Sequence, residues 1–238
     1  MTTFDQSEYQ VRCEWGQRGL TELAPVSEVV ILVDVLSFTT ALDVATSRAA
    51  TVFPYPLTGP SASDYAATMD ATLASADRSA GFSLSPASLK CLPGGSRLVL
   101  PSPNGAALSF AIHHPSVLAA CLRNAPSVSR AADRLGSTFA VVPAGETWSN
   151  GELRPCLEDL IGAGAVIANL PGTRSPEAEW AAACFQHFRA VALINALRQS
   201  GSGKELMERG FGCDVDLAAE FDVSANVPRL AGHGFVSA

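Results

Sequence analysis

The chain has 238 residues, a formal net charge of −7, 47% hydrophobic residues and 16% charged residues. This composition supplies a sizeable core and excludes a disordered or fibrous protein. Because the sequence contains no basic run, neither nucleic acid nor an anionic membrane is an expected partner.

The N-terminus and the cysteines indicate a cytoplasmic protein. Residues 1–17 lack the basic-then-apolar order of a signal peptide, and no apolar stretch is long enough to span a membrane. The 6 cysteines include no C-x-x-C pair, which favours reduced thiols over a zinc knuckle. The sequence also lacks H-E-x-x-H, G-x-S-x-G, and a G-x-G-x-x-G after a predicted strand. Zinc hydrolases, serine hydrolases and nicotinamide enzymes are therefore not indicated.

The stretch from residue 29 to residue 40 predicts a strand, a polar turn and a helix start, with helix over 41–48. Asp34 interrupts the apolar run, where an unpaired charge is costly. In open α/β sheets, ligands bind outside the carboxyl ends of strands, so Asp34 is a candidate site residue. Taken alone, it could instead cap the turn. The hydroxyl residues that follow could bind an anion at the helix start: Ser37, Thr39 and Thr40.

The next segments predict alternating strands and helices. Strands are expected at 51–55 and 97–101, and a long loop rich in Ser, Pro and Gly at 79–95. One helix is expected over 63–78, because four apolar residues recur at helical spacing: Tyr65, Met69, Leu73 and Ala76.

Asn104 and Gly105 form a turn that follows the strand at 97–101. Asn-Gly is typical of a β-hairpin, and it also suits a phosphate-binding turn that leaves backbone N–H groups free. The segment 106–112 predicts a helix rather than a strand, which favours the phosphate-binding interpretation.

The C-terminal half continues with strands and longer helices. The expected elements are strands at 117–121 and 138–142, helices at 126–135, 156–170, 176–199, 201–212 and 214–221, and a glycine-rich tail over 227–236. The alanine-rich helix 176–199 could pack against a second copy, giving a homodimer, or belong to the core. Glu158 and Asp159 lie in the first turn of a helix, where acidic residues also stabilise the helix dipole.

A unit of strand, polar turn and helix recurs four times, at Asp34, Asn104, Asn124 and Glu146. This repetition predicts a three-layer α/β/α fold with a mostly parallel or mixed sheet. We expect one domain over residues 1–238, with two subdomains split near 115–150 as the alternative. The four turns are expected along one edge of the sheet. There the following side chains could converge: Asp34, Ser37, Thr39, Asn104, Arg123, Asn124 and Glu146.

In their order and spacing, the motifs resemble those of the 2-phosphosulfolactate phosphatase family, the magnesium-dependent enzymes of coenzyme M biosynthesis. The resemblance covers most of the chain. The matching pieces are V-D-V-L-S-F-T-T at 33–40 against D-V-L-R-A-T-T, G-F-S-L-S-P at 81–86 against G-F-D-x-x-N-S-P, P-N-G at 103–105 against T-N-G, L-R-N at 122–124, the A-G, L-E-D and A-G block over 144–164, the S-x-G-x-x-L segment at 202–214, and V-P at 227–228.

Two departures from the family pattern concern the substrate. Ser37 and Phe38 stand where the signature has Arg and Ala, and residues 56–60 stand where a G-G-E-R stretch is expected. If the family arginine contacts the substrate's phosphate or sulfonate, this chain lacks that contact.

The resemblance implies Mg²⁺-dependent hydrolysis of a small anionic phosphate ester, 2-phosphosulfolactate, to sulfolactate and phosphate. Asp34 and Glu158 are the expected catalytic residues, and the expected Mg²⁺ ligands are Asp34, Glu146, Glu158 and Asp159. Adjacent helical residues lie about 100° apart, so only one of the acids at 158 and 159 is expected to face Asp34, and we favour Glu158. The expected phosphate- and substrate-binding residues are Ser37, Thr39, Thr40, Asn104, Gly105, Arg123 and Asn124.

Three questions stay open from the sequence. Asp34 could be a nucleophile that forms an aspartyl-phosphate or a metal ligand. The substrate could be another small phosphate ester, because Ser37 alters the expected pocket. The protein could also be a non-catalytic metal- or anion-binding member of the same fold.

Overall fold

The computed structural model describes residues 3–56 and 61–238, and their main feature is one nine-stranded sheet. The stretch 57–60, within the second departure from the family pattern, lies outside the described residues. In spatial order the strands are β1 (Val11–Cys13), β7 (Phe139–Pro143), β2 (Val29–Val33), β6 (Val117–Ala120), β10 (Pro228–Ala231), β11 (Gly234–Ser237), β3 (Thr51–Tyr55), β5 (Arg97–Pro101) and β4 (Thr72–Leu73).

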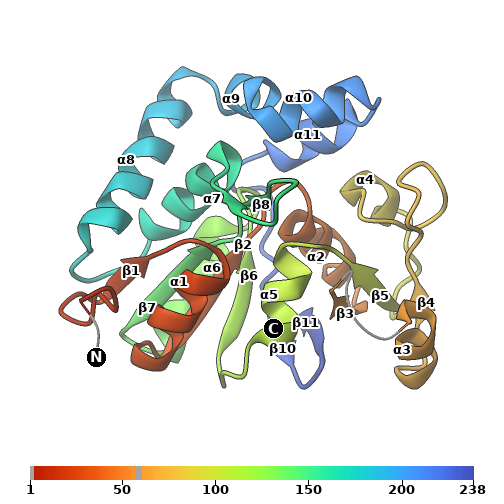
Figure 1. Ribbon diagram of the computed structural model, residues 1–238, viewed down its shortest axis with the longest axis horizontal. Coiled ribbons are helices and arrows are strands. Elements are labelled where there is room, and N and C mark those ends of the chain that lie inside the picture. The colour runs from red at the N-terminus through yellow and green to blue at the C-terminus, as the bar shows by residue number, and fades with distance from the viewer. Residues whose placement is uncertain (1–2, 57–60) are drawn as a thin grey trace.

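The sheet contains two parallel blocks joined by a hairpin. Strands β1, β7, β2 and β6 are parallel to one another, and so are β3, β5 and β4. The hairpin β10–β11 pairs antiparallel with β6 on one side and with β3 on the other. The second block therefore runs against the first. The predicted fold class, a mostly parallel mixed sheet flanked by helices, is confirmed (Figure 1).

Helices surround the sheet, and a short hairpin lies in the loop that follows β7. The helices are α1 (Gly16–Leu23), α2 (Phe38–Thr46), α3 (Ala62–Thr68), α4 (Pro86–Leu89), α5 (Gly105–Ala111), α6 (Ala125–Leu135), α7 (Leu157–Ile167), α8 (Pro176–Val191), α9 (Leu193–Gln199), α10 (Gly201–Glu208) and α11 (Gly212–Ala218), with a 3₁₀ turn at Ala24–Val26. The hairpin pairs β8 (Glu146–Thr147) with β9 (Leu153–Arg154). Among the described residues, no helix combines the length and apolar character of a membrane span.

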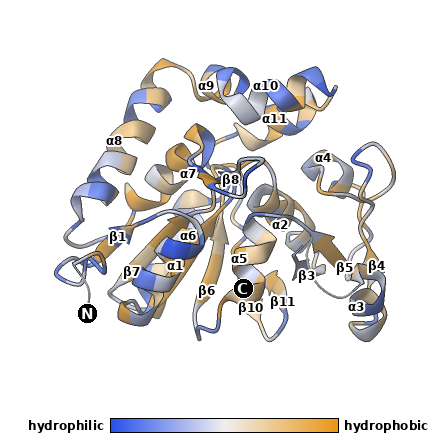
Figure 2. Cartoon of the chain, in the orientation of Figure 1, coloured by the Kyte–Doolittle hydropathy of each residue, from blue (hydrophilic) through white to orange (hydrophobic). Residues whose placement is uncertain are grey.

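Strand β2 is apolar throughout because both of its faces are covered. Val30 and Leu32 pack with residues of α1 and α5, whereas Ile31 and Val33 pack with residues of α6, α7 and α8. Successive side chains of a strand point to opposite faces, so a strand between two helical layers has no polar side. Figure 2 shows the resulting concentration of hydrophobic residues in the central strands and α7.

Helix α7 lies close against α8, and this contact fixes the helix that carries Glu158 and Asp159. A Cβ atom on Gly164 would lie 2.0 Å from the carbonyl oxygen of Ala181. Only glycine allows the two backbones to approach so closely. The predicted start of this helix, near residue 156, agrees with the structure to within one residue.

Two predicted helices are wrong. Helix α3 ends at Thr68, Asp70 has a positive φ of 48°, and Thr72–Leu73 is the edge strand β4, so no helix runs over 63–78. Backbone pairing with β5 replaces helical bonds there. The helix expected over 176–199 is divided at Ala192, whose φ of 168° and ψ of 107° are not helical.

The sequence did not predict that the glycine-rich tail forms strands. It forms β10 and β11, which occupy the centre of the sheet rather than trail from it. Asn226 and Ser224 anchor the segment before β10 by donating hydrogen bonds to the buried carboxylate of Asp43 on α2. These two strands depend on pairing with β6 and β3, which are distant in the sequence, so the local composition does not predict them.

Candidate active site

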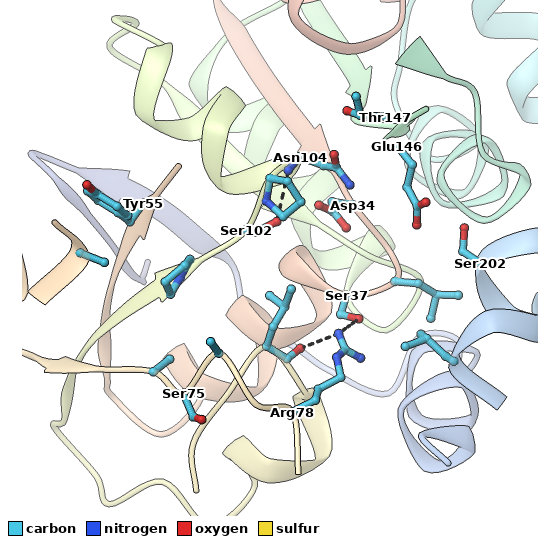
Figure 3. A pocket seen from close by; sticks show the side chains of 18 of the residues that line it. Asp34, Ser37, Tyr55, Ser75, Arg78, Ser102, Asn104, Glu146, Thr147 and Ser202 are labelled. Carbon is cyan, nitrogen blue, oxygen red and sulfur yellow. Dashed lines mark hydrogen bonds between the residues drawn. The ribbon is translucent and has the colours of Figure 1, made fainter. Parts of the chain in front are cut away.

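A cavity of about 810 Å³ lies at the carboxyl ends of strands from both blocks of the sheet (Figure 3). Asp34 follows β2, Tyr55 ends β3 and Pro101 ends β5, and all three residues line the cavity. Sheets twist by roughly 20–25° per strand, so the steps from β2 through the hairpin to β3 rotate the strand direction through roughly 90°. This rotation lets two blocks that run in opposite directions present their carboxyl ends to one space.

The cavity has an acidic side and a basic side. Asp34, Asn104 and Glu146 lie together in Figure 3, and Arg78 enters from the opposite side and reaches Ser37. Residues 74–78, which follow β4, form the wall that carries Arg78. The remaining wall comes from α10 and the residue after it, with Ser202, Glu205, Leu206 and Arg209.

The carboxylate of Asp34 is held by the backbone at the starts of two helices. The Gly105 N–H of α5 donates to Oδ2 at 2.8 Å, and the Phe38 N–H of α2 donates to Oδ1 at 3.2 Å. We predicted that the Gly105 N–H holds phosphate, but in the structure its partner is Asp34. The side-chain amide of Asn104 faces the cavity and has no hydrogen-bond partner among the described residues, so it is available to a ligand.

Burial raises the pKa of Asp34 to about 6. The two backbone N–H groups oppose this rise because they stabilise the carboxylate, and the charges of Glu146 and Glu158 add to it. Burial also raises the pKa of Asp159, with the charges of Asp34 and Glu158 as further causes. Several carboxyl groups therefore lie close enough to oppose one another's ionisation, and a bound cation would relieve this repulsion.

Glu146 and Glu158 form a candidate cation site with Cys156. One ligand atom from each residue lies within 4.8 Å of the others. Glu158 is 2% exposed and does not itself line the cavity, and no side chain or backbone group in the described part of the chain donates a hydrogen bond or ion pair to its carboxylate. Glu146 lines the cavity and pairs with Arg154 at 2.6 Å. The fully enclosed side-chain atoms without a partner in the described part of the chain are Tyr55 Oη and Asn226 Oδ1, so the Glu158 oxygens keep some contact with solvent and are open to a cation.

Cys156 is the member of this cluster that the sequence analysis missed. Burial and the neighbouring carboxylates Asp159 and Glu158 raise the pKa of its thiol, and Sγ donates to the carbonyl oxygen of Arg154 at 3.2 Å. The thiol therefore stays protonated at neutral pH. The ligands that remain are carboxylate oxygens, which suit a hard cation such as Mg²⁺ better than a soft one.

Asp159, Thr39 and Thr40 bind backbone rather than face the cavity. Asp159 accepts hydrogen bonds from the N–H groups of Val35 and Gly145, at 2.7 and 2.9 Å, and so links the ends of β2 and β7. The hydroxyls of Thr39 and Thr40 donate to the carbonyl oxygens of residues 34 and 35. These residues shape the turn that holds Asp34, and the cavity lining does not include them.

Arg123 and Asn124 do not join the other predicted residues. Arg123 donates to Asp43 at 2.9 Å and pairs with Glu220. Asn124 is fully buried, and its side chain bonds to the backbone of Cys121 and Asn226. Neither lines the cavity. The prediction that all the polar turns converge is therefore wrong for this turn, because the C-terminal segment covers it.

Arg78 was also missed by the sequence analysis, which placed it at the end of a helix. Nη1 pairs with the buried carboxylate of Asp214 at 3.1 Å, and Nη2 donates to Ser37 Oγ and to the carbonyl oxygen of Leu84. Its side chain is 10% exposed and lines the cavity. The sequence did not indicate that the Arg78 side chain reaches the cavity, because its position depends on a loop that folds back over α2.

Comparison with known proteins identifies the family of this chain. A model of the 2-phosphosulpholactate phosphatase family matches residues 18–233. The chain belongs to this family. The family resemblance that its motifs indicated is confirmed. The match begins after β1 and ends in the turn before β11, so it includes β2, β6 and β7 of the first block, the whole of the second block and every residue of the acidic cluster.

Two curated relatives share part of the family sequence with this chain. The 2-phosphosulfolactate phosphatase of Methanothermobacter thermautotrophicus is 33% identical over 134 residues, which cover 56% of this chain and 56% of that protein. The probable 2-phosphosulfolactate phosphatase of Gloeobacter violaceus is 31% identical over 141 residues, covering 59% of this chain and 58% of that protein. The alignment thus spans less than two thirds of either relative.

Proposed function

We propose that this protein is a Mg²⁺-dependent phosphatase that hydrolyses a small phosphorylated acid, with 2-phosphosulfolactate as the substrate. The observation that carries the proposal is a cluster of carboxylates: Asp34 and Glu146 line a cavity that Arg78 also lines, and Glu158, whose carboxylate has no donor in the described part of the chain, lies beside Glu146. Family membership supports the phosphatase class. The named relatives support the substrate.

Glu146 and Glu158 are the proposed metal ligands. Bound there, Mg²⁺ would neutralise phosphoryl oxygens and lower the pKa of a coordinated water. Phosphate monoester hydrolysis is among the slowest uncatalysed reactions, so the site must supply strong charge stabilisation. The side-chain amide of Asn104 would donate to the phosphoryl group from the same side of the cavity.

We assign Asp34 the role of general base. Its position is fixed by two backbone N–H groups, and each carboxylate oxygen keeps a lone pair for an attacking water. A pKa near neutrality suits a group that takes a proton during turnover. The role of metal ligand is the alternative for Asp34, and metal affinity distinguishes the two. If Asp34 is the general base, the Asp34→Asn variant should lose turnover and still bind Mg²⁺. If Asp34 is a metal ligand, the variant should lose both turnover and Mg²⁺ binding.

Phosphate release from a panel of small phosphorylated acids, with Mg²⁺ and with chelator, tests the proposal. Metal-dependent turnover of 2-phosphosulfolactate supports it in full. Turnover of another ester would support the phosphatase reaction with a different substrate. This is the second candidate function, because Ser37 stands where the family signature has an arginine. Folded protein that binds Mg²⁺ without turning over any ester would instead be a binding protein.

A further inference from the structure

We propose that Arg78 and Ser37 form a subsite for a second acidic group of the substrate, a carboxylate or sulfonate, separate from the group that reacts. The inference rests on the proposed function, because it assigns the part of the substrate that lies away from the phosphoryl group. It names a positioning and specificity residue, Arg78, that neither the motifs nor the comparisons assign.

The first observation is the fixed orientation of the guanidinium. Three hydrogen bonds hold Arg78, to Asp214, Ser37 and the Leu84 carbonyl oxygen. A guanidinium has five N–H groups, so two of them have no partner in the described part of the chain. A buried arginine held in one orientation binds an oxyanion with little loss of conformational freedom.

Asp214 holds Arg78 and is itself held from another direction. Its Oδ1 accepts hydrogen bonds from the Ser85 hydroxyl at 2.7 Å and the Ala87 N–H at 3.0 Å, and only Oδ2 meets Arg78. Asp214 is fully buried and does not line the cavity. The ion pair therefore fixes Arg78 from behind, and a ligand in the cavity can contact the guanidinium without displacing its partner.

Ser37 supplies a donor to the same space. Its Oγ accepts a hydrogen bond from Arg78, which leaves the hydroxyl proton free to point into the cavity. In the family signature this position is an arginine, whereas here a guanidinium reaches the position from residue 78. The basic side of the cavity is thus provided by a different segment of the chain.

A second arginine, Arg209, lies at the same wall of the cavity. The guanidinium carbon of Arg78 lies 5.6 Å from the ring centre of Phe211, and that of Arg209 lies 5.8 Å from the same ring. Arg209 also lines the cavity, with Glu205 as an exposed partner. Each guanidinium has a carboxylate partner, Asp214 for Arg78 and Glu205 for Arg209, so this wall offers N–H donors to an anionic group rather than a net positive charge.

Two substrates and one product, sulfolactate, test the subsite. The variant is Arg78→Met, assayed on 2-phosphosulfolactate and on phenyl phosphate, which lacks a second acidic group. Loss of charge-assisted hydrogen bonds is expected to raise KM for 2-phosphosulfolactate about 10- to 100-fold. The kcat for that substrate and the rate on phenyl phosphate should change little. Equal losses on both substrates, or no loss on either, would overturn the proposal.

Arg123→Met is the matched control. Arg123 is also an arginine paired with a buried aspartate, with a side chain 13% exposed against 10% for Arg78, but it lies outside the cavity lining. It should leave KM for both substrates unchanged. Arg78→Lys, which keeps the charge but loses the planar fork, should recover part of the affinity for 2-phosphosulfolactate.

A binding measurement separates this inference from the proposed function. Calorimetry with sulfolactate needs no turnover, so it tests the subsite even if the wild-type protein hydrolyses neither ester. Wild-type protein should bind sulfolactate about 10- to 100-fold more tightly than Arg78→Met, provided both melt cooperatively. If Arg78→Met fails to fold, Arg78→Lys replaces it in this measurement, because it keeps a cation beside Asp214, and it should bind sulfolactate more weakly than wild type. Binding equal to wild type in the variant that folds contradicts the subsite.

Discussion

The N–H of Gly105 donates to Oδ2 of Asp34 at 2.8 Å, and a Cβ atom on Gly105 would lie 2.6 Å from that same oxygen. The hydrogen bond and the missing side chain depend on each other. The Asn104-Gly105 turn can approach Asp34 closely enough to orient it only because residue 105 has no Cβ. The start of α5 is thereby joined to the end of β2 at the acidic side of the cavity.

Gly105→Ala is expected to displace the Asp34 carboxylate. The new methyl group would also meet the Phe38 ring, 2.6 Å away, so neither neighbour can give way freely. A shift of about 1 Å in a catalytic group can lower kcat by about 100-fold. Phosphate release measures this loss. Gly94→Ala is the control, because its Cβ would have one contact, at 3.5 Å, and should leave both rate and stability unchanged.

Glu158→Gln should increase the stability of the metal-free protein and remove its response to Mg²⁺. The charge of Glu158 opposes the ionisation of Asp34 and Asp159, so neutralising it is expected to raise the free energy of unfolding by about 1 kcal/mol. Wild-type protein should gain about 2.7 kcal/mol at Mg²⁺ concentrations 100-fold above Kd, and the variant should gain none. Urea unfolding with Mg²⁺ and with chelator measures both effects.

Glu177→Gln is the control for that substitution. Glu177 also lies in the first turn of a helix, α8, but it is exposed. The two variants lose a similar helix-dipole interaction, so any difference between them reports the burial of Glu158. A Glu158→Gln protein that still gains stability from Mg²⁺ would show that the metal binds elsewhere.

The raised pKa of Asp34 predicts a pH dependence of stability in chelator. The folded-state pKa is about 6, against about 4 for an unfolded aspartate, so the folded protein binds more protons between these values. The contribution of Asp34 to the free energy of unfolding therefore falls as pH rises from 4 to 7. This contribution is lost above pH 6. A carboxylate whose pKa is lowered in the folded state has the opposite pH dependence, because its contribution is lost as the pH falls.

Asp34→Asn isolates this contribution because asparagine does not titrate. The stability of the variant relative to wild type should change in the variant's favour by about 2 kcal/mol between pH 4 and pH 7. Urea unfolding of both proteins at each pH, in chelator, gives the difference. A relative stability that is constant with pH would mean that Asp34 is not a buried group with a raised pKa.

Asp43→Ala should destabilise the protein without altering the cavity. Asp43 is buried and accepts hydrogen bonds from Arg123, Ser224 and Asn226, so its removal leaves all three donors without this partner. The expected loss in the free energy of unfolding is about 3 kcal/mol. Asp216→Ala, which removes an exposed partner of Arg198, should cost less than about 1 kcal/mol. An equal loss in the two variants would contradict the structural role of Asp43.

The elements that could be predicted from sequence are those with a strong local signal. The apolar run of β2, the acids that open α7 and the Asn-Gly turn each occur where a strand or helix begins or ends, so Asp34, Glu158 and Gly105 could be placed near one edge of the sheet. The strand order could not be predicted. The β10–β11 hairpin lies between the two parallel blocks, and its short strands carry no distinctive periodicity.

The basic side of the cavity could not be predicted for a related reason. Arg78 depends on Asp214, which is 136 residues later in the chain, and on Ser37, which is 41 residues earlier. Arg123, which follows the apolar stretch 117–122, was the expected substrate-binding arginine, yet its partner Asp43 holds it outside the lining. Long-range ion pairs decide which arginine faces the cavity.

The most direct test of the proposed function is phosphate release from 2-phosphosulfolactate by the wild-type protein, with Mg²⁺ and after chelation. We predict turnover that requires Mg²⁺, is lost with chelator, returns when Mg²⁺ is restored, and is absent in Asp34→Asn. Activity that persists in chelator, or near-normal turnover by Asp34→Asn, would contradict an active site built on Asp34, Glu146 and Glu158.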